Sequence, residues 1–269
     1  MSFNDPDPTS FVCVRATLPR LPLISARKSV VTERLVIRPL APEDAQAYHV
    51  LRTQPDVMVR TAAGIPDKDL VETQAKLDLY LPPNDATTFN FAICLRKKED
   101  DKHAEEGGAG EMIGAGGVHM WRGAFGWPEL GYMIRTEHWG KGIVTEFVKG
   151  FLGVWAGLER EEREVLVDER FVVWVSEGGR GIEGTSKGNG EDDKVDGVGR
   201  RLAEEHLIAI TQTDNVGSLK VLERSGFEFV FTWTTADSRA KTGEDGRERL
   251  ENVQVELPVY RIFPGRIRS

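Results

Sequence analysis

A glycine-containing corner at residues 136–147, TEHWGKGIVTEF, constrains this chain more than any other feature. A strand-like run precedes the corner, and apolar residues then recur at four-residue steps: Ile143, Phe147, Phe151 and Trp155. This spacing predicts a helix whose apolar stripe covers a sheet. Gly140 and Gly142 let the backbone adopt unusual angles and let another group approach the main chain closely. The corner therefore holds either a ligand or another part of the protein.

A loop that ends a strand and starts a long helix presents main-chain amides at the positive end of the helix dipole, which suits a phosphate group. Residues 140–145 would supply these donors, with Lys141 among them. The chain has no GxxxxGK(S/T) segment, which excludes a P-loop, and it lacks the repeated βαβ units of a Rossmann site. The corner thus indicates a different phosphate carrier, and a tight turn without a ligand is the alternative.

The remaining pattern predicts one α/β domain over residues 30–263. The expected elements are a strand at 34–40, helices at 41–53 and 66–81, strands at 87–96, 110–121 and 128–135, the corner helix, a strand at 206–213, a helix at 214–227 and a terminal strand pair. Asp214 or Asn215 caps the helix at 214–227, and Gly226 ends it. The first strand of the terminal pair is expected to carry Phe227, Phe229, Phe231 and Trp233 on one face.

Three segments lie outside this pattern. Residues 1–29 include four prolines and predict an N-terminal arm with at most local extended structure. Residues 176–200 are dominated by glycine and charge, which predicts a flexible surface insertion. Residues 264–269 form a short C-terminal tail.

Composition narrows the possible partners. A formal charge of −8 and a pI near 5.3 argue against nucleic acid or an anionic membrane as a partner, because both are polyanions. No apolar run approaches ~18 residues, and the acidic start of the chain is unlike a secretory signal, so we expect a cytoplasmic protein. The two cysteines and five histidines show no metal-ligand spacing, and no metal is predicted.

Two motifs carry a resemblance to a known family. The run LGYMIRTEHWGKGIVTEFV is followed about 65 residues later by LIAITQTDNVGSLKVLERSGFEFV. Together they resemble the GNAT superfamily of acyl-CoA N-acyltransferases, and in particular its ribosomal-protein N-terminal acetyltransferase branch. That branch has W-G-K-G-x-A-T-E and N-x-x-S-x-x-V-L-E-x-x-G-F segments in this order. The opening TERLVIRPLAPEDA is also similar, and the resemblance covers roughly residues 30–235.

The resemblance implies a GNAT fold, with a mixed, mostly antiparallel sheet splayed at its middle and helices on both faces. It also implies acetyl-CoA as cosubstrate. The family's diphosphate loop, Q/R-x-x-G-x-G/A, corresponds here to Trp139, Gly140, Lys141, Gly142, Ile143 and Val144, followed by Thr145. Strand residues Met133 and Ile134 would pair with the pantetheine arm. Asn215 and Ser218 match the N-x-x-S positions that face the pantetheine and thiol.

Acetyl transfer to an amine needs a neutral nucleophile and a proton for the departing thiolate. Many family members place a tyrosine in the short helix as the acid, but this chain has Leu222 there, so Ser218 is the candidate acid. Glu129, which starts the central strand, is the candidate base, and His119 is a second one. Each has a structural alternative: a helix N-terminal serine, a surface carboxylate or a hydrogen-bonded histidine.

The sequence hypothesis is an N-acetyltransferase that moves an acetyl group from acetyl-CoA to a primary amine by direct transfer in a ternary complex. The acceptor would be a protein N-terminus or a small amine, because an α-amine with a pKa near ~8 is already partly neutral at physiological pH. The alternative is a CoA-binding or protein-interaction module that keeps the fold without turnover. The substitutions at Val144 and Leu222 leave that alternative open.

Overall fold

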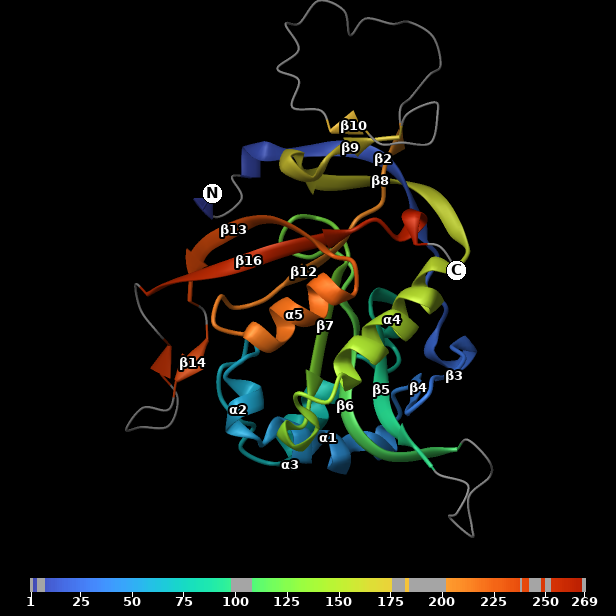
Figure 1. The fold of residues 1–269 in the computed structure, drawn as a ribbon, viewed down its shortest axis with the longest axis vertical. Coiled ribbons are helices and arrows are strands. Elements are labelled where there is room, and N and C mark those ends of the chain that lie inside the picture. Colours follow the sequence, from blue (N-terminus) through green and yellow to red (C-terminus); the bar gives the residue numbers. More distant parts are fainter. Residues whose placement is uncertain are drawn as a thin grey trace, which may run out of the picture.

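A nine-stranded sheet forms the centre of the computed structural model (Figure 1), which describes residues 2–3, 8–97, 108–175, 182–183, 202–237, 239–241, 248–249 and 253–267. In sheet order the strands are β1 (Ser2–Phe3), β13 (Glu228–Ala236), β16 (Gln254–Ile262), β12 (Leu207–Ile210), β7 (Glu129–Ile134), β6 (Ala109–Met120), β5 (Phe89–Arg96), β4 (Leu35–Pro39) and β3 (Val30–Val31). Among these described strands, β7 with β12 and β1 with β13 pair in parallel and the other pairs are antiparallel. The predicted mixed, mostly antiparallel sheet is confirmed.

The sheet opens at its middle, between β7 and β12. The two strands are paired only where Ile208 lies opposite Glu129 and Ala209 opposite Leu130. β12 then ends at Ile210, whereas β7 continues to Ile134 and stays paired with β6 on its other side. Within the described residues, the last part of β7 therefore has a backbone edge without a neighbouring strand.

Helices cover both faces of this sheet. On one face lie α4 (Ile143–Ala156) and α5 (Val216–Arg224), and on the other lie α1 (Ala45–Arg52), α2 (Pro55–Met58) and α3 (Leu70–Asp78). Short 3-10 helices cover Pro8–Ser10, Ile24–Ala26, Pro42–Asp44, Asn84–Thr87, Thr136–His138, Glu169–Phe171 and Pro264–Arg266. None of the described helices has the length and apolar character needed to cross a membrane.

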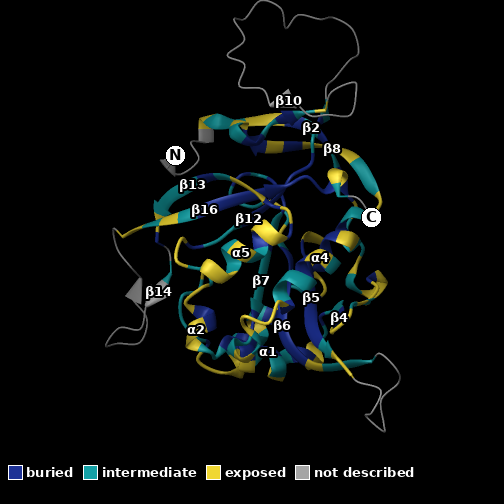
Figure 2. Ribbon diagram, viewed as in Figure 1, coloured by how far each residue is buried: buried dark blue, intermediate teal, exposed yellow. Residues whose placement is uncertain are grey.

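The apolar stripe predicted for the corner helix packs on the sheet as expected. Phe147, Phe151 and Trp155 of α4 are fully buried, and Phe151 contacts the rings of Phe89 and Phe91 on β5. Burying each such side chain stabilises the fold by roughly 1.5–3 kcal/mol relative to leaving it exposed. Figure 2 shows the buried residues concentrated along the central strands and the helix faces turned toward them.

A second sheet packs against the β12, β13 and β16 end of the first. Its strands, in order, are β10 (Ile182–Glu183), β9 (Val173–Trp174), β11 (Leu202–Ala203), β2 (Phe11–Pro19) and β8 (Arg160–Asp168), and a separate pair joins β14 (Ala240–Lys241) to β15 (Glu248–Arg249). Phe125, Phe171 and Phe231 are buried together between the two sheets.

Strand β2 corrects one expectation, because it lies inside the predicted N-terminal arm. It pairs antiparallel with β8 along all nine of its residues. Val14, Ala16 and Leu18 alternate into the core, so the segment has the two-residue period of a half-buried strand. The prolines misled the prediction because Pro8 and Pro19 bound the strand instead of interrupting it.

The prediction that four aromatic residues share one face of β13 is also wrong. A β-bulge lies between Phe229 and Phe231, and the extra residue changes which way the following side chains point. Phe231 is buried, whereas Phe229 is 53% exposed. Most of the predicted insertion at 176–200 lies outside the described residues, which include only the two-residue strand β10 within it.

Candidate active site

The glycine corner joins β7 to α4 as the sequence predicts. After Ile134 the chain makes a 3-10 turn at Thr136–His138 and enters α4 at Ile143. Gly140 and Gly142 have φ angles of +71° and +74°, a left-handed conformation that side chains of L residues resist. A Cβ added at Gly140 would meet no atom within 4 Å, so there the glycine leaves the main chain open to the surface.

The corner presents a run of unused main-chain donors. Within the described residues, no hydrogen bond occupies the amides of residues 140–145, and the amide of Glu146 is the first to bond back, to the Gly142 carbonyl at 3.1 Å. These amides lie at the positive end of the fourteen-residue helix α4. The arrangement suits an anionic group such as a diphosphate.

Side chains from distant elements hold this corner in place. Gln54, at the start of α2, accepts a hydrogen bond from the Thr136 amide at 2.8 Å and donates to Glu137 at 3.0 Å. The Trp139 indole donates to the Ile134 carbonyl at 2.9 Å. Arg34, which precedes β4, donates from Nη1 to the Lys141 carbonyl at 2.8 Å. The loop is therefore preorganised, which reduces the entropy lost when a ligand binds.

Tyr132 and Ser218 meet beside the opening in the sheet. The Asn215 side chain accepts a hydrogen bond from the Ser218 amide at 3.2 Å and caps α5, which resolves the choice between Asp214 and Asn215. The Ser218 hydroxyl lies close enough to the phenol of Tyr132, on β7, to influence its pKa. Burial raises the pKa of Tyr132 to about 12, although the Ser218 hydroxyl opposes the shift. The phenol is therefore neutral at physiological pH and able to donate a proton.

Leu222 occupies the position where many family members have a tyrosine. Its side chain is buried in the core formed by α4 and the central sheet. A residue there packs against apolar groups and cannot supply a proton. Tyr132 brings a hydroxyl to the same side of the sheet from another element.

His119 and Glu129 form a second polar pair at the other end of β7. The register shifts between Val118 and Met120, which makes His119 the extra residue of a β-bulge. Its Nε2 atom lies 3.6 Å from Oε1 of Glu129, a distance of electrostatic contact and too long for a good hydrogen bond. Two glycines make room for the pair, because a Cβ at Gly131 would meet the imidazole at 2.7 Å and one at Gly123 would meet the carboxylate at 2.6 Å.

Burial shifts the pKa of Glu129, whose side chain is 13% exposed. It raises the pKa of this carboxyl, while the His119 charge and a hydrogen bond from the Ala124 backbone oppose the shift. A carboxylate with a raised pKa holds an abstracted proton more firmly than one with the ordinary value. The environment of Glu129 therefore suits proton abstraction.

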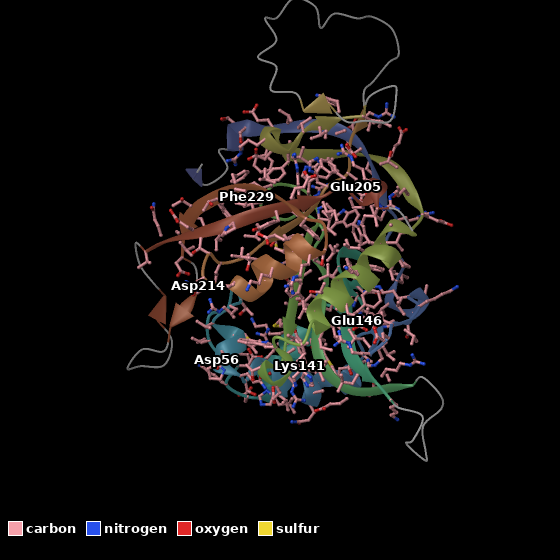
Figure 3. The ribbon with its side chains drawn as sticks, viewed as in Figure 1. Asp56, Lys141, Glu146, Glu205, Asp214 and Phe229 are labelled. Atoms are coloured by element: carbon pink, nitrogen blue, oxygen red, sulfur yellow. The ribbon has the colours of Figure 1, made fainter. Side chains whose placement is uncertain are left out.

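The predicted site residues fall into two groups. The corner residues and the pair Asn215 and Ser218 lie on the α4 and α5 side, where Lys141 is exposed at the start of α4 (Figure 3). Val144 is partly buried against the core of that side. His119 and Glu129 lie at the start of β7, and Glu129 is three residues, or about 10 Å, from Tyr132 along the strand.

Met133 and Ile134, the two residues predicted to pair with pantetheine, differ in their contacts. Met133 packs against the cluster under α1, on the opposite face from the α4 cluster that Tyr132 joins. The Ile134 carbonyl already accepts the Trp139 indole. The open backbone edge of β7 nevertheless includes both residues.

Sequence reasoning placed the thioester in the gap beside Tyr132 but gave that residue no chemical role, and it did not identify Arg34 or Gln54 as site residues. Arg34 and Gln54 reach the corner across 107 and 82 positions of sequence, and contacts of that range leave no local pattern. Tyr132 alternates with Gly131 and Met133 on a strand, which marks it as a strand residue and says nothing of Ser218.

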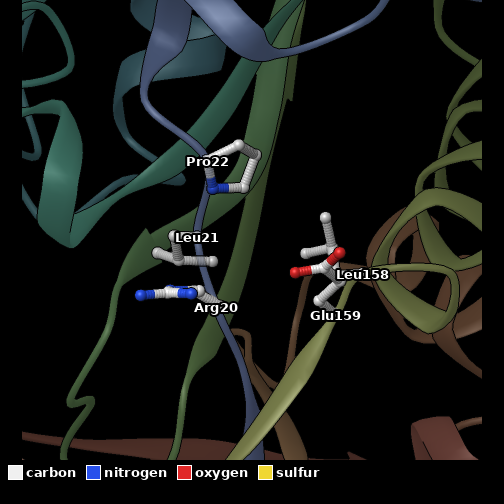
Figure 4. A pocket seen from close by; sticks show the side chains of 5 residues that line it. All are labelled: Arg20, Leu21, Pro22, Leu158 and Glu159. Atoms are coloured by element: carbon white, nitrogen blue, oxygen red, sulfur yellow. The ribbon is translucent and has the colours of Figure 1, made fainter.

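A groove of about 300 Å³ lies away from this site (Figure 4). Arg20, Leu21, Pro22, Leu158 and Glu159 line it, where the chain between β2 and β3 passes the C-terminal end of α4. It contains none of the corner residues and is not the candidate site. In the described ranges, no three His, Cys, Asp or Glu side chains are grouped so that they could hold a metal ion.

The family follows from a direct match. Residues 34–228 match the family model described as the acetyltransferase (GNAT) domain, which spans well over half of the chain. The chain belongs to the GNAT acetyltransferase family. A comparison with curated proteins found no significant match.

Solved structures share the fold at low sequence identity. A GNAT-family acetyltransferase from Bacillus anthracis has 16% identity and a TM-score of 0.51, covering 88% of this chain and 99% of its own. The microcin self-immunity acetyltransferase MccE, solved with acetyl-CoA and AMP, has 12% identity and a TM-score of 0.52, covering 86% and 93%. RimL, a ribosomal alpha-N-protein acetyltransferase solved with coenzyme A, has 12% identity and a TM-score of 0.50, covering 88% and 99%.

Proposed function

We propose that this protein transfers an acetyl group from acetyl-CoA to a primary amine by direct transfer in a ternary complex. The observation that carries the proposal is the run of unpaired amides at residues 140–145, next to the opening between β7 and β12. A diphosphate held there would place the pantetheine arm along the free edge of β7. That two family relatives were solved with acetyl-CoA or coenzyme A supports the choice of carrier.

In the proposed reaction, the amine nitrogen attacks the thioester carbonyl, a C–N bond forms and the C–S bond breaks. Glu129 takes the amine proton, directly or through a water, and its raised pKa suits this role. His119 stabilises the carboxylate before transfer. Ser218 donates the proton that the departing thiolate needs, and the neutral phenol of Tyr132 supports it.

The acceptor that fits best is a protein N-terminus or a small amine. An α-amine with a pKa near ~8 is more often neutral at physiological pH than a lysine side chain with a pKa near ~10.4, so it depends less on a general base. The motif resemblance favours the ribosomal-protein N-terminal branch within the family. RimL shares the fold at 12% identity, and the acceptor panel described below tests the branch.

Thermal unfolding with and without acetyl-CoA tests the carrier. Binding should stabilise the protein by ~2.7 kcal/mol at one hundred times the dissociation constant. If millimolar acetyl-CoA produces no stabilisation, the proposed function is wrong.

Release of free thiol tests turnover. We expect acetyl-CoA-dependent release with at least one acceptor from a panel of N-terminal peptides, polyamines and aminoglycosides. Binding without release across the whole panel would favour a CoA-binding or interaction module. The buried Leu222, at the position where many family members have a catalytic tyrosine, motivates this alternative.

A further inference from the structure

Arg34 links the N-terminal part of the domain to the glycine corner. It lies in the turn between β3 and β4, and its Nη1 donates to the Lys141 carbonyl at 2.8 Å. Its Nε donates to Oε2 of Glu146 at 2.6 Å, and its backbone amide donates to Oε1 at 2.8 Å. Thr32 from the same turn also donates to Oε1 of Glu146, at 2.6 Å.

Glu146 presents a problem for phosphate binding that this arrangement removes. A carboxylate in the first turn of α4 competes with a phosphate for the positive helix end and repels it. Burial would raise the pKa of Glu146, but hydrogen bonds from Thr32 and Arg34 outweigh burial and lower it. The carboxylate thus stays charged and is paired with a guanidinium, so its repulsion of an anion at the corner is offset.

The same guanidinium has a donor left for a ligand. Within the described residues, no hydrogen bond is made by Nη2 of Arg34, and the side chain is 44% exposed. Nη2 lies 3.6 Å from the position that a Cβ at Gly142 would occupy, so the free donor faces the corner. A planar guanidinium can serve a carboxylate, a carbonyl and a phosphate at once.

We propose that Arg34 is both a positioning residue for the diphosphate loop and a ligand of the diphosphate itself. This inference rests on the proposed function, since it requires that the corner binds a CoA diphosphate. Arg34 sets the Lys141 carbonyl away from the ligand, neutralises Glu146 and adds one charged hydrogen bond to those of the amides.

Calorimetric titration with CoA and with 3′-dephospho-CoA tests this role. Arg34→Gln should weaken both ligands by the same factor, about 10- to 100-fold for a lost charged hydrogen bond. Arg34→Lys should fall between this variant and the unchanged protein, because a lysine keeps the charge and cannot serve three partners. A loss confined to CoA would assign Arg34 to the 3′-phosphate and overturn the proposal.

The double variant Arg34→Gln, Glu146→Gln separates the two roles. If Arg34 also contacts the diphosphate, removing the Glu146 charge should recover only part of the lost affinity. Full recovery would show that Arg34 acts solely by neutralising Glu146, and the ligand role would be wrong. Melting curves of each variant would show whether it remains folded.

Arg15→Gln is a matched control, because Arg15 is a partly exposed, ion-paired arginine on the second sheet and its loss should leave affinity unchanged. If the unchanged protein binds neither ligand, the proposed function fails. If it binds both and Arg34→Gln binds equally well, only this inference fails.

Discussion

Two buried or half-buried histidines show how differently this molecule uses the same side chain. His206, at the junction of the two sheets, is fully buried, and no described group hydrogen-bonds either of its ring nitrogens. Aromatic rings enclose it, with Phe263 at 4.7 Å and Trp127 at 5.0 Å between centroids. His119 lies on a β-bulge, is 31% exposed and faces the carboxylate of Glu129.

The surroundings of His206 suit a packing role, and those of His119 suit a chemical one. His206 is held neutral, since burial lowers its pKa to about 3 and the charges of Arg261 and Arg266 act in the same direction. It behaves as one more ring of an aromatic core. His119 has an ionisable partner and glycines that leave room beside it, which are features of a site. We therefore expect substitutions near His119 to affect rate and those at His206 to affect stability.

The largest expected effect is on catalysis, from Glu129→Gln. Removing the base should lower kcat about 100- to 1000-fold, because general base catalysis contributes on this scale. CoA affinity should not change, since Glu129 lies at the far end of β7 from the corner. Steady-state kinetics and calorimetry would measure the two, with Glu164→Gln on the exposed side of β8 as control. A kcat within threefold of the unchanged protein would contradict the assignment.

The next effect concerns the acid, on the α4 side of β7. Ser218→Ala should lower kcat about 100-fold and Tyr132→Phe about 10-fold, since a positioned proton donor contributes on this order. Because the two hydroxyls lie close together and interact, the double variant should lose less than the product of the single losses. Strictly multiplicative losses would show that the two groups act independently.

His206 should make stability depend on pH. The unfolded chain binds a proton at its reference pKa of about 6.5, whereas the native protein does so only near pH 3. Between these values the unfolded state binds more protons, so stability falls as the pH is lowered, by up to ~1.4 kcal/mol per pH unit from this residue. Urea unfolding at pH 7 and pH 5 should show a smaller loss for His206→Leu. An equal loss in both proteins would place the pH dependence elsewhere.

The smallest expected effect is on CoA affinity, from removing the Gln54 hydrogen bonds that hold the glycine corner. Gln54→Leu removes the hydrogen bonds to Thr136 and Glu137 without touching a ligand. CoA affinity should weaken about fivefold, as expected for ~1 kcal/mol of lost positioning. Gln74→Leu on α3, which breaks a surface hydrogen bond to Asp78, is the matched control. Unaltered affinity in Gln54→Leu would show that the corner holds its shape without α2.

Local patterns predicted most of the central sheet and the glycine corner between β7 and α4. The helix stripe of α4, the glycines at positive φ and a cap at Asp214 or Asn215 are each visible within a few residues of sequence, and the structure selects Asn215. They were predictable because backbone conformation and helix capping depend on neighbours in the chain.

Features that depend on distant neighbours were missed or misjudged. β2 is a strand because β8, about 150 residues later, pairs with it. Phe229 is exposed because a bulge shifts the register of β13 against β16. Arg34 and Tyr132 are brought to Glu146 and Ser218 only by the fold. No periodicity of the sequence records such contacts.

The central claim is that the main-chain amides of the corner bind the diphosphate of acetyl-CoA. Calorimetric titration of acetyl-CoA into the unchanged protein, Gly142→Asn and Gly142→Asp tests it most directly. Both substitutions place a side chain of nearly the same shape at a φ of +74°, and only one adds a charge. We predict a loss of at least ~100-fold for Asp and a clearly smaller loss for Asn, since charge repulsion adds to the steric effect. Equal affinity for all three proteins would contradict the account.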